Sequence, residues 1–121
     1  MSEKQGARQY DLEDRTFEFA RRVRAFVKAL PHSVANVEDG KQLVRASGSV
    51  GANYIEANES LGKKDFKMHI KISRKEAKES AYWLRLLDTG AEPSINEERQ
   101  SLATEAKELM SIMGAILRNS G

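Results

Sequence analysis

Six basic side chains between Lys64 and Lys78 have the residue type and spacing that most clearly predict a chemistry. In a helix they share one face and form a strip about 20 Å long, at about 1.5 Å per residue. A cationic strip of this length can follow the phosphates of a nucleic acid. No aromatic residues are interleaved with it, which argues against base stacking. This basic ribbon consists of Lys64, Lys67, Lys71, Arg74, Lys75 and Lys78.

The ribbon also has two simpler explanations. A solvated helix face carries charges of this kind without any partner. Alternatively, the ribbon meets an acidic helix of a neighbouring subunit. Acidic residues crowd the last quarter of the chain, at Glu92, Glu97, Glu98, Glu105 and Glu108. RNA or DNA therefore stands as a candidate partner beside these two alternatives.

A row of polar residues lies on one face of the segment 41–61. A binding or catalytic groove between helices would explain such a row, and so would a buried network that fixes helix register. We expect the network, with Arg45 buried and paired to Glu76 or Glu79 of the following helix. The predicted network comprises Arg45, Ser49, Asn53, Glu56, Glu76 and Glu79.

Four apolar residues of the segment 63–88 lie away from the stripe that faces the core. Exposed apolar faces usually mark contacts, so we predict that these residues form part of a homo-oligomer interface. They are expected to pack on the small-residue face of segment 41–61 in another subunit. The alternative is a wide core in which Trp83 closes one end of the bundle. The predicted interface residues are Val44, Ile55, Met68, Ile72, Trp83 and Leu86.

Other catalytic and metal-binding patterns are missing from the sequence. There is no cysteine, and neither His32 nor His69 completes the Glu-x-x-His motif of metal sites in helical bundles. No serine has a histidine within helical reach, which argues against a nucleophilic triad. We predict no catalytic, metal-binding or cofactor-binding residue and no cofactor. The enzymatic alternative is a helical bundle like the chorismate mutases, in which Arg45 and Lys41 bind a small dianion.

Four helices with short connections must position these residues. Pro31 ends the first, and PHSVANVEDG connects it to the second, where Asn36 and Asp39 resemble a cap. The spacing of Ser94 and Glu97 resembles a capping box for the fourth. No strand-like alternation occurs, so the pattern predicts an all-α, antiparallel up-down-up-down bundle. The predicted helices cover residues 11–30, 41–61, 63–88 and about 94–117, after a disordered tail over 1–10, so that 11–121 form one domain.

The helical periodicity also predicts which side chains face the core. In the second helix the apolar stripe ends at Leu61, and Gly48 and Gly51 lie on a different face. Each interior glycine costs about 1 kcal/mol relative to alanine, so we expect a neighbouring backbone to approach closely there. The first helix is expected to use Phe17, Ala20, Val23, Val27 and Leu30, widened by Phe19 and Phe26.

The composition is typical of a single-domain protein with a polar, hydrated surface. The 121 residues are 40% hydrophobic and 31% charged, with a net charge of +2 that by itself implies no nucleic-acid partner. No apolar run approaches the ~20 residues that a bilayer requires, and the N-terminus lacks the apolar region of a secretory signal. We therefore expect a cytoplasmic protein without a membrane partner.

The segment Gln42–Ala57 carries a family resemblance. It resembles the small bacterial four-helix-bundle proteins encoded in 23S rRNA intervening sequences, whose pattern is roughly Gln-x-x-Arg-(small)-x-x-Ser-(Ile/Val)-x-x-Asn-x-x-Glu. DLEDRTFEFARRV and KDFKMHIKISRKEAKESAYWL are similar to the family as well, so that the match covers most of residues 11–90. The residues that meet the pattern are Gln42, Arg45, Ser49, Val50, Asn53 and Glu56.

The resemblance implies an up-down-up-down bundle and commonly a ring-shaped homo-oligomer, often a pentamer. It implies no known catalysis. A distant branch of the family binds nucleic acid and a reverse transcriptase as the accessory protein of diversity-generating retroelements. This chain is far less basic than that branch. The expectation is a non-enzymatic assembly platform, with the basic ribbon as its candidate surface for RNA or DNA.

Overall fold

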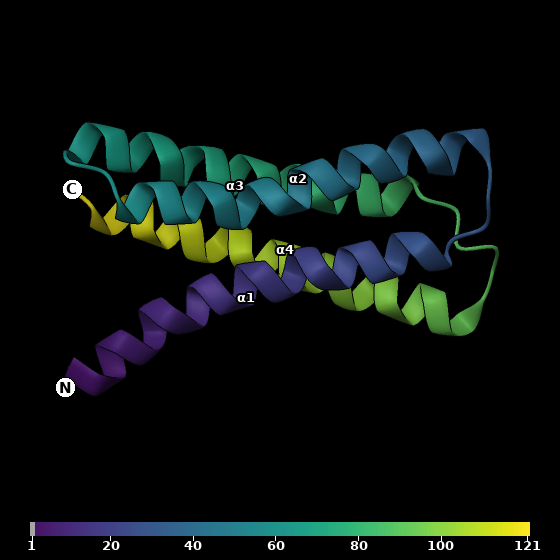
Figure 1. Ribbon diagram of the computed structural model, residues 1–121, viewed down its shortest axis with the longest axis horizontal. Coiled ribbons are helices and arrows are strands. Elements are labelled where there is room, and N and C mark those ends of the chain that lie inside the picture. The colour runs from purple at the N-terminus through teal and green to yellow at the C-terminus, as the bar shows by residue number, and fades with distance from the viewer. Residues whose placement is uncertain (1) are drawn as a thin grey trace.

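Four helices in up-down-up-down order make up the computed structural model, which describes the backbone of residues 2–121 and the side chains of residues 12–121. Consecutive helices run in opposite directions (Figure 1). Each packs on two neighbours: α2 contacts α1 and α3, and α4 contacts α3 and α1. The predicted all-α class is confirmed. The helices are α1 (Ser2–Ala29), α2 (Val34–Asn58), α3 (Lys63–Leu86) and α4 (Pro93–Asn119).

The beginning of α1 differs from the expected start at Asp11, because the helical backbone begins at Ser2. Side chains of residues 1–11 lie outside the described residues, so the disordered tail predicted over 1–10 stays a prediction. The end of α1 agrees with the predicted end at Pro31. Its last helical residue is Ala29, next to the Leu30–Pro31 pair that disfavours the helical conformation.

The predicted connection PHSVANVEDG is wrong, because most of it belongs to α2. Ser33 is the N-cap, and its hydroxyl accepts a hydrogen bond from the Asn36 backbone N–H at 3.1 Å. Asn36 is buried one turn inside the helix. Its amide donates to the carbonyls of Pro31 and Asp88 at 2.9 Å each and accepts from the Asp88 N–H at 2.9 Å. Asn36 therefore ties the first connection to the third, rather than capping α2.

The start of α4 also differs from the prediction. Pro93 is the first helical residue, Glu92 is the N-cap, and no side chain of the predicted Ser94–Glu97 capping box bonds the helix end. Proline suits this place, since its fixed φ is helical and it has no N–H to leave unpaired. Across the connection, Arg99 of α4 donates to the carbonyl of Leu87, just past the end of α3.

The core lies along the inner faces of the helices. Its members come from all four helices, and most are aliphatic. Leu61 is an exception to the prediction: it is fully exposed because α2 ends at Asn58 and leaves it in the loop. The fully buried large side chains are Phe19, Leu43, Ile70, Leu84, Leu87, Leu102, Leu109, Met113, Val23 and Val50.

In α1 the expected stripe is partly wrong. Phe17 is 64% exposed, and Ala20 and Val27 are only half-buried, whereas Phe19 and Phe26 lie in the core. The buried stripe is therefore rotated relative to the predicted one. The side chains that it leaves out face the seam between α1 and α2. The described side chains that α1 buries are Leu12, Thr16, Phe19, Val23 and Phe26, and Leu30 is buried just after its end.

The interior glycines of α2 explain this seam. A Cβ at Gly51 would lie 2.8 Å from Thr16 Oγ1 and 3.1 Å from Thr16 Cβ, so α1 approaches too closely for any side chain. The hydroxyl of Thr16 is held in place by bonds to the carbonyls of Leu12 and Glu13, both 3.0 Å. The predicted close approach is confirmed at Gly51. At Gly48 the nearest atom is Arg24 Nη2 at 3.3 Å, the end of a flexible side chain.

The two glycines give a matched pair of variants. Both gain the helix propensity of alanine, about 1 kcal/mol, but only Gly51→Ala creates an overpacked contact. We expect Gly51→Ala to be less stable to urea than Gly48→Ala by about 1–3 kcal/mol. Urea unfolding of the two proteins followed by circular dichroism measures this difference. Equal stabilities would contradict the tight α1–α2 contact.

Candidate functional site

Four basic side chains of α3 line a shallow hollow of about 250 Å³. Lys71, Arg74, Lys75 and Lys78 are all exposed, and within residues 12–121 none lies within 4 Å of a carboxylate oxygen. We call these four residues the basic hollow. Arg118 of α4 reaches the same side, because its Nη1 and Arg74 Nε both lie within 4 Å of the place that a Cβ would take at Gly114. The cations thus concentrate charge without an internal counter-ion.

The rest of the basic ribbon behaves differently. Lys67 is half-buried, and its Nζ donates to the Gly121 carbonyl at 2.9 Å, which ties α3 to the C-terminus. Lys64, the second residue of α3, is exposed and does not line the hollow. The structure therefore gathers four of the six predicted ribbon residues into one concave place. It also adds Arg118, which sequence reasoning did not include.

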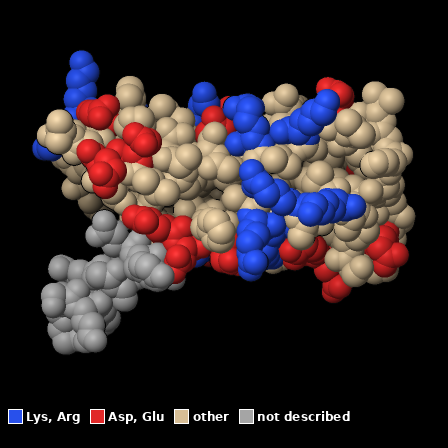
Figure 2. All heavy atoms as spheres, viewed as in Figure 1, with Lys and Arg blue, Asp and Glu red and all other residues tan. Residues whose placement is uncertain are grey.

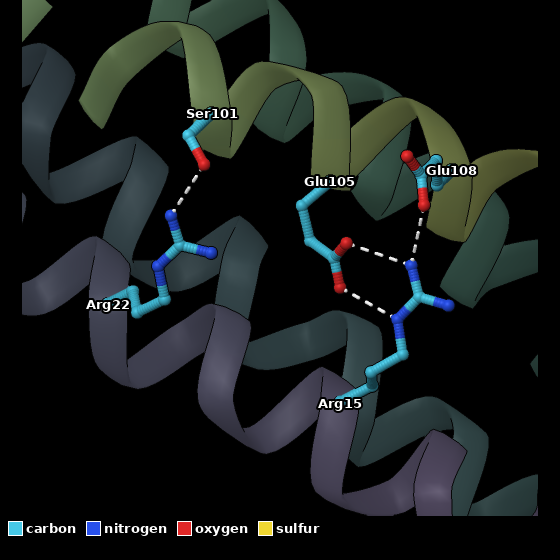
Figure 3. Close-up of polar contacts among 5 residues, drawn as sticks. All are labelled: Arg15, Arg22, Ser101, Glu105 and Glu108. Atoms are coloured by element: carbon cyan, nitrogen blue, oxygen red, sulfur yellow. Dashed lines mark hydrogen bonds and ion pairs between the residues drawn. The ribbon is translucent and has the colours of Figure 1, made fainter. Parts of the chain in front are cut away.

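Acidic residues of α4 are occupied elsewhere, in ion pairs with α1 (Figure 3). Arg15 makes a two-point contact with Glu105, at 2.9 and 2.8 Å, and a further bond to Glu108 at 2.9 Å. Arg22 does the same with Glu98, at 3.2 and 3.0 Å. The hydrogen bond to Glu105 raises the pKa of Arg15, and the bond to Glu98 raises that of Arg22, so both stay charged.

Sequence reasoning missed these pairs and considered the α4 acids only as alternative partners of a neighbouring subunit's basic ribbon. A signal was present: Arg15 and Arg22 stand seven residues apart, as do Glu98 and Glu105. Seven residues are about two helical turns, so both sets share a face on antiparallel helices. The pairs link α1 to α4, and three of the five acids thought free to neutralise α3 are held within the chain.

The predicted polar network does not form. Arg45 is exposed, donates only a long bond of 3.5 Å to Gln42, and has no ion pair with Glu76 or Glu79. The expectation of a buried Arg45 is wrong for the single chain. Across the α2–α3 seam, Ser73 Oγ donates to the Val50 carbonyl at 2.8 Å. Arg45 instead lines a hollow between α1 and α2.

Other members of the row lie at the edge of the same seam. Asn53 donates to the Ser49 carbonyl at 2.9 Å, and its Oδ1 is 3.2 Å from His69 Nδ1. His69 Nε2 lies 3.7 Å from an Asp65 oxygen. Glu56 is exposed and Ser49 is half-buried. A short polar chain that runs through His69 therefore replaces the predicted network.

Glu76 is the one member of the set that is deeply buried, at 7% exposure. Its Oε1 is inaccessible and has no hydrogen-bond partner among the described residues. On the same side of α3, two turns further on, the indole Nε1 of Trp83 is also buried without a partner. An acceptor and a donor are thus left unsatisfied on one flank of α3, although buried polar groups are normally paired.

The seam between α1 and α2 holds the two largest described hollows, of about 430 and 490 Å³. They follow one another along the antiparallel pair, and their walls are mainly apolar or small residues. We call them together the α1–α2 groove. Val44 lines the first hollow and Ile55 the second, as expected of a receiving surface. The apolar and small residues of the groove are Phe17, Ala20, Val27, Leu30, Pro31, Val37, Gly40, Val44, Gly48, Gly51, Ala52 and Ile55.

Basic residues rim this groove. Figure 2 shows Lys and Arg gathered over the face formed by α1 and α2, with Asp and Glu toward the ends of the molecule. Arg21 and Lys41 are paired locally with Glu18 and Glu38. The guanidinium of Arg24 is bonded only to the carbonyl of Ala20, at 2.9 Å, among the described residues. The residues that line the groove with a positive charge are Arg21, Arg24, Lys41 and Arg45.

The predicted interface residues of α3 divide between core and surface. Met68 and Leu86 are about half exposed, at 47% and 49%. Ile72 and Trp83 are half-buried; Trp83 packs on the edge of the core and lies edge-on to the exposed ring of Tyr82. Trp83 is thus partly packed on the core and partly available at the surface. We call Met68, Ile72, Trp83 and Leu86, with Glu76 and Glu79 between them, the α3 flank.

The dianion site of the enzymatic alternative has limited support. Lys41 and Arg45 do line one hollow together, but its walls are largely apolar and Lys41 is paired with Glu38 at 3.4 Å. Within the described residues, no group of three or more carboxylate or imidazole side chains could hold a metal ion. Nor is any described helix long and apolar enough to cross a membrane.

Comparisons with known proteins agree with the fold. The sequence profile of the family described as 23S rRNA-intervening sequence protein matches residues 8–115. A crystal structure from Bacteroides thetaiotaomicron, of a protein of unknown function in the S23 ribosomal protein family, is 31% identical with a TM-score of 0.74. The match covers 88% of this chain and 97% of that one. No curated protein shows significant similarity to the chain.

The α1–α4 ion pairs give a prediction about stability. The two-point Arg15–Glu105 contact is partly shielded from water, whereas the Arg21–Glu18 pair on α1 is exposed. A double-mutant cycle to glutamine, read by urea unfolding, should give a coupling energy of about 1 kcal/mol for the first pair. The second pair serves as the control and should give roughly 0.3 kcal/mol. Equal couplings would show that the contact does not hold α1 to α4.

Proposed function

The chain belongs to the family of 23S rRNA-intervening sequence proteins, and on that premise we propose that it is a non-enzymatic, self-assembling helical bundle that contacts the phosphate backbone of a nucleic acid. The observation that carries the proposal is the basic hollow. Its four cations come from one rigid helix, face solvent together, and have no carboxylate partner among the described residues. Phosphate groups are the partners that such a cluster attracts.

The competing explanations of the basic ribbon are weakened by the α1–α4 ion pairs. Of the five acids available for neutralisation by a neighbouring chain, Glu98, Glu105 and Glu108 are already paired with Arg15 and Arg22. A purely solvated face leaves unexplained why four cations surround one concave place, where like charges repel. An anionic partner removes that repulsion. The absence of aromatic residues in the hollow favours contact with phosphates over contact with bases.

Self-assembly is supported by apolar surface that one chain leaves uncovered. The α3 flank exposes about half of Met68 and of Leu86, and the α1–α2 groove remains open along its length. Continuous apolar surfaces of this kind mark protein contacts. The two surfaces differ, so the contact is heterologous, and such contacts form a closed ring when the rotation divides a full turn. In a ring, every subunit presents its own basic hollow, which multiplies the phosphate contacts.

A helical enzyme that binds a small dianion is a weaker candidate. Such a site needs converging polar groups in a pocket. The hollow beside Arg45 offers a single unpaired cation in mainly apolar surroundings. We therefore assign the apolar hollows to assembly and the basic hollow to the nucleic acid.

The proposal predicts salt-dependent binding of structured RNA or duplex DNA. Neutralising four phosphates gives a log–log slope of about −3 against salt concentration. The variant Lys71→Glu/Lys75→Glu should lose binding at every salt concentration, because it inverts the charge of the hollow. Fluorescence anisotropy with labelled RNA and DNA at several salt concentrations measures both effects.

The control is Lys28→Glu/Lys107→Glu, which changes net charge equally at exposed positions on α1 and α4. This variant should keep most of the affinity if the hollow is the site. Equal losses in the two variants would show a general charge effect instead of a site. If the wild-type protein binds neither RNA nor DNA at low salt, the nucleic-acid part of the proposal is wrong.

A further inference from the structure

The buried carboxylate of Glu76 lacks a partner, and it lies within the surface proposed for assembly. Glu76 is on the α3 flank, between Ile72 and Trp83 in sequence and on the same side of the helix. Its Oε1 and the Trp83 Nε1 are both shielded from solvent and unbonded among the described residues. A buried carboxylate oxygen or indole N–H without a partner is unfavourable, because buried polar groups are normally hydrogen-bonded. In the single chain these two polar atoms therefore lack hydrogen-bond partners, and a polar group from another molecule would supply one.

The α1–α2 groove holds the complementary charge. Arg24 lies midway along it, over Gly48, with Nη2 3.3 Å from the place of a Cβ. Apart from one bond to its own helix, at Ala20, its guanidinium has no partner among the described residues. The small residue beneath it leaves room for the side chains of another helix. Arginine suits a buried interface because its planar donors match a carboxylate in two-point geometry.

The distribution of charge along α3 agrees with this pairing. The apolar side chains of the α3 flank are accompanied by carboxylates, Glu76 and Glu79, whereas the residues of the basic hollow are centred about a quarter of a turn away around the helix. An α3 flank placed in the groove brings its acids to the basic rim. Apolar and electrostatic complementarity thus favour one docking direction.

We propose that the α3 flank of one copy occupies the α1–α2 groove of the next, where Glu76 pairs with Arg24 of that copy. This inference rests on the self-assembly proposed above, and it names the contact through which assembly occurs. Arg24 cannot serve its own Glu76, because α1 and α3 are not in contact within the bundle. Arg45 of the same chain is exposed, is bonded to Gln42 and makes no ion pair with Glu76.

The test compares the assembly of matched variants by sedimentation velocity over a range of protein concentrations. Glu76→Gln and Arg24→Gln keep the shape of each side chain approximately and remove one charge. Each should raise the concentration for half-assembly by roughly tenfold or more, because it leaves the other charge buried and unpaired. Circular dichroism should show unchanged helical content. The control, Glu97→Gln on the exposed side of α4, should assemble like the wild type.

The charge exchange distinguishes a direct pair from two independent effects. Glu76→Arg and Arg24→Glu should each abolish assembly, and the double variant Glu76→Arg/Arg24→Glu should restore it at least in part. Failure of the double variant to recover would overturn the pairing. So would normal assembly of both glutamine variants, while self-assembly itself would stand. A wild type that sediments as a 13.6 kDa monomer at all concentrations would remove self-assembly and this contact together.

Discussion

A helix in a four-helix bundle buries one stripe against two neighbours, and this limit shapes the whole surface of the protein. α3 has more apolar side chains than its core stripe can use, because Ile70, Ala77 and Leu84 already fill that stripe. α1 and α2 approach most closely at Thr16 and Gly51, and small residues elsewhere along their seam line open hollows. The flank and the groove are thus consequences of the same packing, and one copy of the chain covers neither.

The arrangement of charge follows from the same geometry. α1 contacts α4, so its arginines meet the acidic side chains there and form ion pairs that are partly shielded from water. The lysines of α3 stand at the outer side of their helix and have no such neighbour. A net charge of only +2 therefore conceals a local concentration of positive charge. Composition could not reveal this separation, because it depends on which helices are adjacent.

Sequence patterns gave the helices and most of the core, since both depend on local periodicity. They failed where a single residue had a tertiary role. Asn36 resembled a cap but connects two loops, and Ser33, a plain N-cap, was overlooked. Arg45 looked buried because the helix around it is small or apolar, but burial depends on where the neighbouring helix crosses. The basic hollow was foreseen as a ribbon, whereas Arg24 and the groove required the α1–α2 distance, which no sequence spacing encodes.

The placement of the α3 flank in the groove of another copy is the central claim, and a cysteine-free chain allows a direct test. Ala52→Cys lies in the groove and Ile72→Cys on the flank, and Lys107→Cys on α4 is the control. A short bis-maleimide is added to mixtures of single-cysteine variants, and the products are resolved by mass spectrometry. The account predicts abundant covalent 52–72 heterodimers and few products containing position 107. Equal yields for all pairs, or no 52–72 product, would contradict it.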